Sequence, residues 1–247
     1  MKRLLALLAP AVFILSTSAA ERPALPEAHT TRNLEGWSVR IDDRLLTGAG
    51  AALGERALKL LNARLVAITF VVPEPALAKL RAVTIQLDRD YGELRPTQYH
   101  PSRGWLKEKG YSEALAKSVH IPNADDFLSP FDLHRMPWVV LHELVHAYHD
   151  QVLGFEEPRL VAAWKQFRDS GKYQLVLTSY GAMREHYGRT NAKEFFAEMT
   201  ESYFGSNDFF PFVAGELKQA EPEIFALLAE IWGPLPTNAK PRPTPLP

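Results

Sequence analysis

Three residues near the middle of the chain have types and spacing suited to holding a metal ion beside a base. His142 and His146 are four positions apart, so on a helix both imidazoles lie on one face at adjacent turns and can share one ion. Glu143 projects from the neighbouring edge of that face, where it can reach a water molecule on the ion without being a ligand. Zinc lowers the pKa of such a water, and a nearby carboxylate can accept its proton. The sequence HELVH at 142–146 therefore predicts a Zn²⁺ centre with Glu143 as general base.

The competing interpretation of this segment is a solvated helix face with at most one buried histidine. Apolar residues surround the motif on most sides, which favours a buried helix whose ionisable groups need a partner. The segment departs from the metzincin pattern, in which Gly and then His follow the second ligand at three-residue intervals, because His149 and Val152 occupy those places. One straight helix cannot wrap three side chains around a tetrahedral ion, so we expect His149 beside the ligands or at the surface.

A third ligand is predicted 48 residues after His146, in the segment NAKEFFAEMTE at 191–201. Glu194, Glu198 and Glu201 stack at i, i+4 and i+7, where like charges repel unless a dication or a histidine N–H group relieves them. We therefore expect Glu194 as the third zinc ligand and Glu198 as the acceptor of an N–H group from a ligating histidine. The alternatives are a capping box formed with Asn191, or an exposed acidic face.

These two segments together give the chain a resemblance to a known family. With a glutamate ligand on a second helix and another acid four residues later, it looks like a zincin metallopeptidase of the glutamate-ligand kind. More narrowly, HELVHAYHD at 142–150 and YGRTNAKEFFAEMTESYFG at 187–205 resemble the catalytic domain of anthrax toxin lethal factor and its bacterial relatives. The likeness covers residues 80–205, and its EFFAE part is considerably more specific than its HExxH part.

The resemblance also implies a tyrosine, seven residues before the ligand glutamate, that donates a hydrogen bond to the developing oxyanion. Tyr187 occupies that position. One such donor can contribute about 2.7–4 kcal/mol to catalysis. An ordinary interfacial tyrosine is the alternative, with Tyr180 and His186 as rival donors. The chain lacks the toxin's large delivery and substrate-binding regions, so cleavage of kinase kinases is not implied. The roles implied by the resemblance are zinc ligation by His142, His146 and Glu194, with Glu143 as base.

The elements that must position these residues are predicted from apolar spacing and turn signals. Pro137 suits the first turn of a helix and Gly154 suits its end, so the histidine segment is expected to form one helix of about four turns. Strands first and mostly helices after Pro137 predict an α+β, zincin-like fold rather than an alternating parallel sheet. The other predicted elements are strands at 37–41, 83–87 and 118–121, helices at 54–64 and 75–80, and a continuous apolar run at 65–72.

Both chain ends are predicted to lie outside the folded unit. Residues 1–20 have the basic start, apolar middle and small-residue exit of a signal peptide. Residues 21–35 are polar and contain proline, which predicts a flexible segment. Residues 233–247 hold six prolines, which predicts a Pro-rich disordered tail. One zincin-like metallopeptidase domain is therefore expected at 36–232.

Composition excludes several classes of protein. No window reaches the roughly 18 uninterrupted apolar residues of a membrane helix, so no span is expected after signal cleavage. The absence of cysteine argues against disulfides, a lipid anchor on cysteine and a cysteine-closed structural zinc site. Without Lys2 and Arg3, 26 basic side chains face 29 acidic ones, a balance of −3 with no basic run, so nucleic acid is not an expected partner. We expect a secreted or periplasmic protein.

These features predict a secreted zinc peptidase that acts on a peptide or protein substrate. Zincins commonly align an extended substrate along an edge strand beside the active helix, and 118–121 or 83–87 are the candidate strands here. The polar and aromatic cluster at 97–106 either shapes the cleft or forms a structured turn, and its His100 has no spacing that suits a ligand. The rival functions are hydrolysis of a non-peptide or cell-wall amide bond by the same centre, and a catalytically silent zincin-fold binding protein, which Glu143 disfavours.

Overall fold

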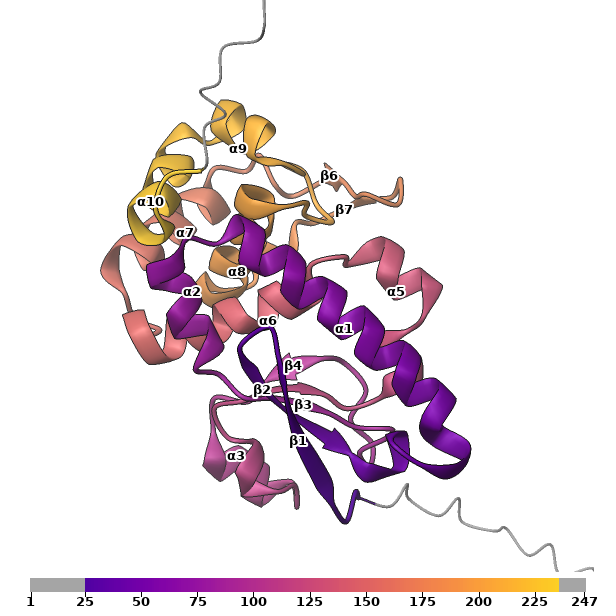
Figure 1. Cartoon of the computed structure of the whole chain (residues 1–247). Coiled ribbons are helices and arrows are strands. Elements are labelled where there is room, and N and C mark those ends of the chain that lie inside the picture. Colours follow the sequence, from indigo (N-terminus) through magenta and orange to yellow (C-terminus); the bar gives the residue numbers. More distant parts are fainter. Residues whose placement is uncertain (1–24, 236–247) are drawn as a thin grey trace, which may run out of the picture.

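The computed structural model describes residues 25–235 (Figure 1). The predicted signal peptide at 1–20 lies outside the described residues, as does the predicted tail beyond residue 235. Within the described range the chain mixes helices with a five-stranded sheet, which confirms the α+β class. None of the helices in that range combines the length and the apolar character that a bilayer span requires.

The sheet has three parallel inner strands between two antiparallel edge strands. The predicted strands at 37–41, 83–87 and 118–121 are confirmed as these inner strands. Their parallel pairing differs from the expectation, because two helices cross over between the first and the second of them. In sheet order the strands are β1 (His29–Leu34), β2 (Trp37–Asp42), β3 (Ile85–Leu87), β5 (Val119–Ile121) and β4 (Gln98–Tyr99).

The predicted flexible segment at 21–35 is wrong for its second half, because residues 29–34 form β1. This strand pairs with β2 along its whole length, from His29 opposite Asp42 to Leu34 opposite Trp37. The two-residue turn between them has positive φ at both Glu35 (51°) and Gly36 (95°), as tight hairpins require. As an outer strand, β1 leaves most of its side chains exposed, so its sequence lacks the apolar alternation of a buried strand.

The candidate substrate strands at 118–121 and 83–87 are also corrected by the structure. Both are interior, since β3 lies between β2 and β5, and β5 lies between β3 and β4. The edge beside the histidine helix is β4, two residues long, inside the polar and aromatic cluster at 97–106. A strand of two residues carries no periodicity from which it could be predicted.

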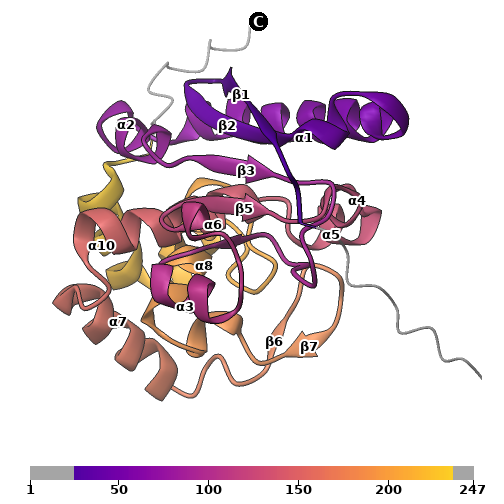
Figure 2. The same ribbon diagram turned by 90° about the horizontal axis from the view of Figure 1, so that it is seen from below.

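Two helices, α6 (Val139–Tyr148) and α8 (Ala192–Phe204), pack against each other beside the sheet (Figure 2). The longest described helix, α1 (Ala51–Val71), includes the predicted helix at 54–64 and most of the apolar run at 65–72, because its buried residues keep helical spacing from Gly54 to Ile68. The other helices are α2 (Glu74–Arg81), α3 (Arg103–Glu108), α4 (Ala124–Phe127), α5 (Pro130–Arg135), α7 (Pro158–Asp169), α9 (Ala214–Ala220) and α10 (Pro222–Trp232), and a small hairpin joins β6 (Val176–Leu177) to β7 (Met183–Arg184).

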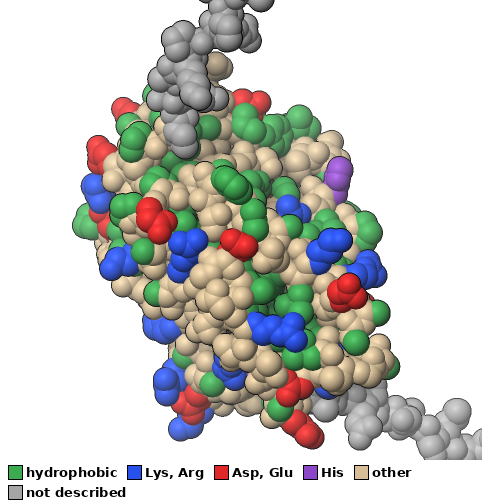
Figure 3. Space-filling view, viewed as in Figure 1, with side chains coloured by type: hydrophobic (Ala, Val, Ile, Leu, Met, Phe, Trp, Pro, Cys, Tyr) green, Lys and Arg blue, Asp and Glu red, His purple; other side chains and the backbone are tan. Residues whose placement is uncertain are grey.

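The main hydrophobic core lies between one face of the sheet and the helices α1, α6 and α8. A separate small cluster of Tyr91, Leu106 and Leu115 lies under α3. On the face of the molecule seen in Figure 3, charged side chains of both signs are scattered among apolar and neutral ones. This face therefore shows no broad cationic surface of the kind that binds nucleic acid.

Candidate metal centre

The helix α6 carries the two histidines of the motif on the side that faces α8. It continues into a five-residue π-helical stretch, His149–Leu153, and ends at Gly154 with a φ of 84°. The end predicted at Gly154 is thus confirmed. The four-residue spacing brings the rings of His142 and His146 to a centroid separation of 4.7 Å, with their planes nearly perpendicular. Both rings are held on one side of a helix that the core fixes in place.

The helix α8 supplies the third candidate ligand from across the interface with α6. Asn191 caps this helix, since its side-chain oxygen accepts the N–H groups of Lys193 and Glu194 at 2.9 and 3.0 Å. The cap fixes the backbone of Glu194 and leaves its carboxylate free to reach the histidines. Glu194 Oε2 lies 3.1 Å from His142 Nε2 and 3.2 Å from His146 Nε2. The predicted convergence of these three side chains is present in the structure.

Two of the three distances among these nitrogen and oxygen atoms are close to those of a tetrahedral metal site. Bonds of about 2.0–2.1 Å from a tetrahedral ion place its ligand atoms about 3.3 Å apart. The two distances from Glu194 come close to that value, and all three atoms lie within 4.8 Å of one another. Burial alone would lower the pKa of His142, but its hydrogen bonds to Glu194 and Glu201 outweigh burial and hold that pKa well above its ordinary value. The residues therefore fit a divalent cation.

Glu201, rather than the predicted Glu198, lies within hydrogen-bond distance of Nδ1, the second ring nitrogen of His142. Glu201 Oε1 lies 2.5 Å from His142 Nδ1, whereas Glu198 Oε1 lies 3.9 Å from it. A carboxylate at Nδ1 fixes the tautomer that leaves Nε2 free to bind an ion. Both acids belong to the predicted row on α8, and the packing of α8 on α6 brings Glu201, not Glu198, to the histidine.

Glu143 lies beside the ligand set without belonging to it, as predicted. Its side chain is buried, and its Oε2 accepts the backbone N–H of Tyr99 in β4 at 2.7 Å. Burial raises the pKa of Glu143, while His146 and His142 oppose that rise. A carboxylate with a raised pKa is a better proton acceptor than an ordinary glutamate. The edge strand thus orients the candidate base.

A cleft of about 690 Å³ opens over these residues. It is lined by the candidate ligands and Glu143, by α5 and the loop before α6, and by Thr97, Gln98 and Tyr99. The first part of the cluster at 97–106 therefore shapes the cleft, and the rest forms a turn and α3. The edge strand forms one wall, so a chain that enters the cleft meets β4 and the candidate base together.

Tyr187 lies in the short turn before α8 and lines the same cleft. Its side chain is 47% exposed, and burial together with the charge of Glu194 raises its pKa. Neither rival, Tyr180 or His186, is among the described residues that line the cleft. His186 is buried in an aromatic cluster with Phe167, where its Nδ1 accepts the N–H of Gly188.

His149 lies neither beside the ligands nor at the surface, so both predicted positions are wrong. It is fully buried between Phe155 and Phe196, with ring centroids 5.3 and 5.2 Å away. Burial lowers its pKa to about 4. Neither of its ring nitrogens has a hydrogen-bond partner among the described residues. Packing against two phenylalanines from other segments decided this position, and the spacing within α6 did not.

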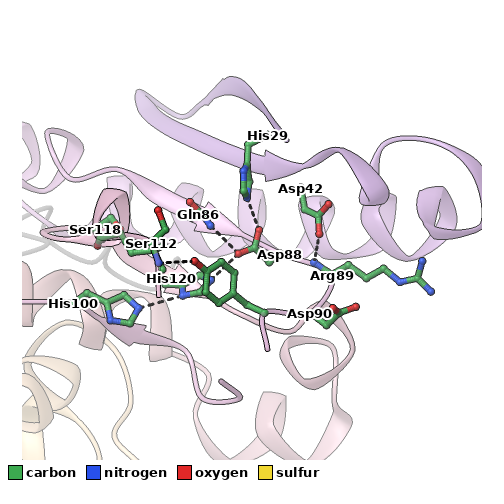
Figure 4. Close-up of polar contacts among 12 residues, drawn as sticks. His29, Asp42, Gln86, Asp88, Arg89, Asp90, His100, Ser112, Ser118 and His120 are labelled. Carbon is green, nitrogen blue, oxygen red and sulfur yellow. Dashed lines mark hydrogen bonds and ion pairs between the residues drawn. The ribbon is translucent and has the colours of Figure 1, made fainter. Parts of the chain in front are cut away.

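A second histidine cluster, which the sequence did not predict, crosses the polar face of the sheet (Figure 4). We call it the histidine relay; it consists of His29, Asp88, His120 and His100. The contacts are 2.7 Å from His29 to Asp88, 2.7 Å from Asp88 to His120 and 3.2 Å from His120 to His100. Its members come from four strands or their ends, so the spacing of residues along the sequence could not predict the cluster.

Comparison with known proteins adds no assignment to this geometry. No protein-family model, no curated protein and no solved structure matches the chain. The residues and their contacts therefore carry every conclusion about function.

Proposed function

We propose that this chain is a secreted zinc-dependent peptidase. The observation that carries the proposal is the convergence of His142, His146 and Glu194 inside an open cleft, with Glu143 beside them. Two imidazoles and one carboxylate, with a fourth position left for water, form the donor set of a catalytic zinc site. A structural zinc site usually closes with four protein ligands, often cysteine, and this chain has no cysteine. Zinc bound here would polarise a carbonyl and bring the pKa of a water near neutrality.

Glu143 moves the proton in this proposal. Its Oε2 is engaged by the N–H of Tyr99, which leaves Oε1 to accept the proton of the attacking water. The protonated carboxyl then delivers that proton to the leaving amine. The raised pKa of Glu143 suits both steps, because a group that takes up a proton and returns it works best with a pKa closer to the working pH.

Tyr187 is the proposed donor to the oxyanion that forms on the attacked carbonyl. Its phenol lines the cleft near Glu194, whose charge contributes to the raised pKa of Tyr187. A raised pKa keeps the phenol protonated at neutral pH, as a hydrogen-bond donor must be. The turn that carries Tyr187 directly precedes α8, so the donor and the ligand Glu194 are placed by one element.

An extended peptide is the proposed substrate because β4 ends the sheet at the wall of the cleft. No other described strand pairs with the outer side of β4, and Tyr99 already directs one N–H group from that side to Glu143. A peptide that adds to this edge would present its carbonyl groups along the cleft. The leader-like residues 1–20 support export as part of the same proposal.

The test is metal analysis of the purified chain together with digestion of casein and of peptidoglycan, with and without a chelator. We expect one zinc per chain and casein cleavage that the chelator abolishes. Glu143→Gln should keep the zinc and lower turnover by about 10²–10⁴-fold, the contribution typical of a general acid–base group. Glu156→Gln, an exposed carboxylate outside the cleft, is the matched control and should change neither.

Other outcomes would select a rival function. Cleavage of peptidoglycan alone would favour a cell-wall amidase with the same centre. Zinc binding without turnover of either substrate would favour a silent binding protein. Absence of bound metal after zinc loading would remove the basis of the proposal.

A further inference from the structure

Three buried acids line the cleft, and two of them, Glu198 and Glu201, approach His142 Nδ1, the nitrogen that does not face Glu194. Glu198, Glu201 and Asp208 all line the cleft, and their exposed fractions are 3%, 3% and 7%. We call these three residues the acidic floor. Only Glu201 has a charged partner within hydrogen-bond distance, namely His142. Buried carboxyl groups at such proximity repel each other unless a cation or protons relieve them.

The carboxyl group of Glu198 is the member of the floor that lacks a partner. Its Oε2 is buried and has no hydrogen-bond partner among the described residues, and its Oε1 lies 3.9 Å from His142. A buried carboxyl oxygen without a hydrogen bond is costly, so its position in an open cleft points to a ligand that supplies the missing donor.

Asp208 is a weaker candidate than Glu198 for binding a donor from a ligand. Burial and the charge of Glu201 raise its pKa to about 7. Arg135 also lines the cleft and partly offsets the charge of Asp208, but its guanidinium lies 3.6 Å from Asp132, which shares it. Asp208 therefore has only a shared cation nearby, and no described cation lies within hydrogen-bond distance of Glu198.

Three apolar side chains line the same cleft. Met136 lies between α5 and α6, Val139 begins α6, and Phe209 comes from the segment after α8. An apolar lining together with an acidic floor matches a side chain that has an aliphatic stem and a cationic end. A hard metal ion is a poorer match, because it prefers six or more oxygen ligands and Glu201 is already held by His142.

We propose that the acidic floor is a specificity subsite that binds a lysine or arginine side chain of the substrate, close to the bond that is cut. This inference rests on the proposed peptidase function, since it assigns a substrate class to the same cleft. Glu198 and Asp208 would pair with the cationic end, and Met136, Val139 and Phe209 would contact the stem. Glu201 would remain with His142.

The test measures binding, so that it does not depend on turnover. Fluorescent alanine-based hexapeptides carry either lysine or norleucine at one position, which is moved along the peptide. Dissociation constants are measured by fluorescence anisotropy with zinc-loaded Glu143→Gln chain. At one position we expect the lysine peptide to bind about tenfold more tightly than the norleucine peptide, equivalent to about 1.4 kcal/mol, because its ammonium group would gain a charge-assisted hydrogen bond.

Two variants and a control assign the preference to the floor. Glu198→Gln and, independently, Asp208→Asn should bring the lysine to norleucine ratio toward one, while Glu156→Gln should leave it unchanged. Equal affinities for the two peptides in the Glu143→Gln chain, or a preference that survives both floor variants, would overturn the subsite. So would a calcium ion that is found by mass spectrometry after dialysis and lost in Glu198→Gln, because it would assign the floor to a metal.

The two proposals fail in distinguishable ways. Lysine-selective binding by a chain that hydrolyses no peptide would contradict the peptidase and leave the subsite standing. Hydrolysis that ignores lysine and arginine would contradict the subsite and leave the peptidase standing.

Discussion

The candidate metal centre and the histidine relay both bring histidines and acids together, yet their hydrogen bonds are arranged differently. In the relay, Asp88 is ionised and only accepts, so His120 donates from Nε2 and its Nδ1 accepts from His100. Each contact has one donor and one acceptor, and they follow one another across the sheet. In the metal centre, two Nε2 atoms point at a single oxygen of Glu194. The relay residues therefore pair donors with acceptors among themselves. In the candidate metal centre, both histidine nitrogens face the same oxygen atom.

The charges of the two clusters differ in the same way. Burial and the neighbouring His120 lower the pKa of His100 to about 3, so the relay histidine stays neutral and Asp88 keeps its charge. In the candidate metal centre, the hydrogen bonds to Glu194 and Glu201 outweigh burial and hold the pKa of His142 well above its ordinary value. Buried histidines therefore indicate a site when their nitrogens converge, and a structural network when they alternate with acceptors.

The largest expected effect in this comparison is on the relay. Asp88→Ala removes the acceptor of both His120 and His29 and should lower the free energy of unfolding by about 3–5 kcal/mol. Zinc stoichiometry should stay at one per chain. Chemical denaturation and metal analysis measure the two effects. Loss of zinc from folded Asp88→Ala would show that the relay helps to hold the metal. It would contradict the interpretation of the relay as a purely structural network.

The next effect concerns the proposed oxyanion donor. Tyr187→Phe should lower kcat by an amount equivalent to about 2.7–4 kcal/mol, with zinc content and melting temperature unchanged. The phenol is partly exposed, so removing its hydroxyl should cost little stability. Tyr180→Phe is the matched control because Tyr180 lies outside the described lining of the cleft. Equal activity in both variants would contradict the role of Tyr187 as the oxyanion donor.

A smaller effect is expected at the acid that orients His142. Glu201→Gln should weaken zinc affinity by about 10–100-fold, as the loss of such an acceptor typically does. Glu198→Gln should change zinc affinity less, since Glu198 lies 3.9 Å from the same nitrogen against 2.5 Å for Glu201. Competition with a chromogenic chelator measures both. A larger loss of zinc affinity in Glu198→Gln than in Glu201→Gln would indicate that Glu198 orients His142.

The smallest effect is expected at His149, which belongs to neither cluster. His149→Phe removes two buried nitrogens that lack partners and should raise the free energy of unfolding at neutral pH by about 1 kcal/mol. An unfolded histidine has a pKa of about 6.5, while that of folded His149 is lowered to about 4. Between these values the unfolded chain binds more protons, so this histidine's contribution falls as the pH drops from about 6.5 to 4. The variant should lose that part of the pH dependence in thermal unfolding at each pH, and an unchanged slope would contradict this assignment.

The sequence could predict those parts of the candidate metal centre that depend only on spacing within one helix. His142, Glu143 and His146 lie within one turn and a half of α6, and Glu194 begins a helix whose cap is visible as Asn191. Helical geometry fixes which of these side chains share a face, whatever the rest of the chain does. The strands β2, β3 and β5 were predictable for a similar reason, because their buried faces impose apolar patterns on the sequence.

Other features depended on contacts between distant segments. The sequence places Glu198 and Glu201 on nearly the same face of α8, and the packing of α8 on α6 decides which of them meets His142. The edge strand β4 is too short to leave a pattern, although its Tyr99 holds Glu143. The relay assembles side chains from His29 to His120 that share no local element.

The sequence by itself therefore determined the chemistry available on each helix, because side-chain direction within a helix follows from its 3.6-residue turn. The tertiary structure decided which oxygen meets which nitrogen, which acids remain without partners and which strand borders the cleft. Those outcomes depend on how helices and strands pack, and packing is set by the combined shape of buried side chains from the whole domain.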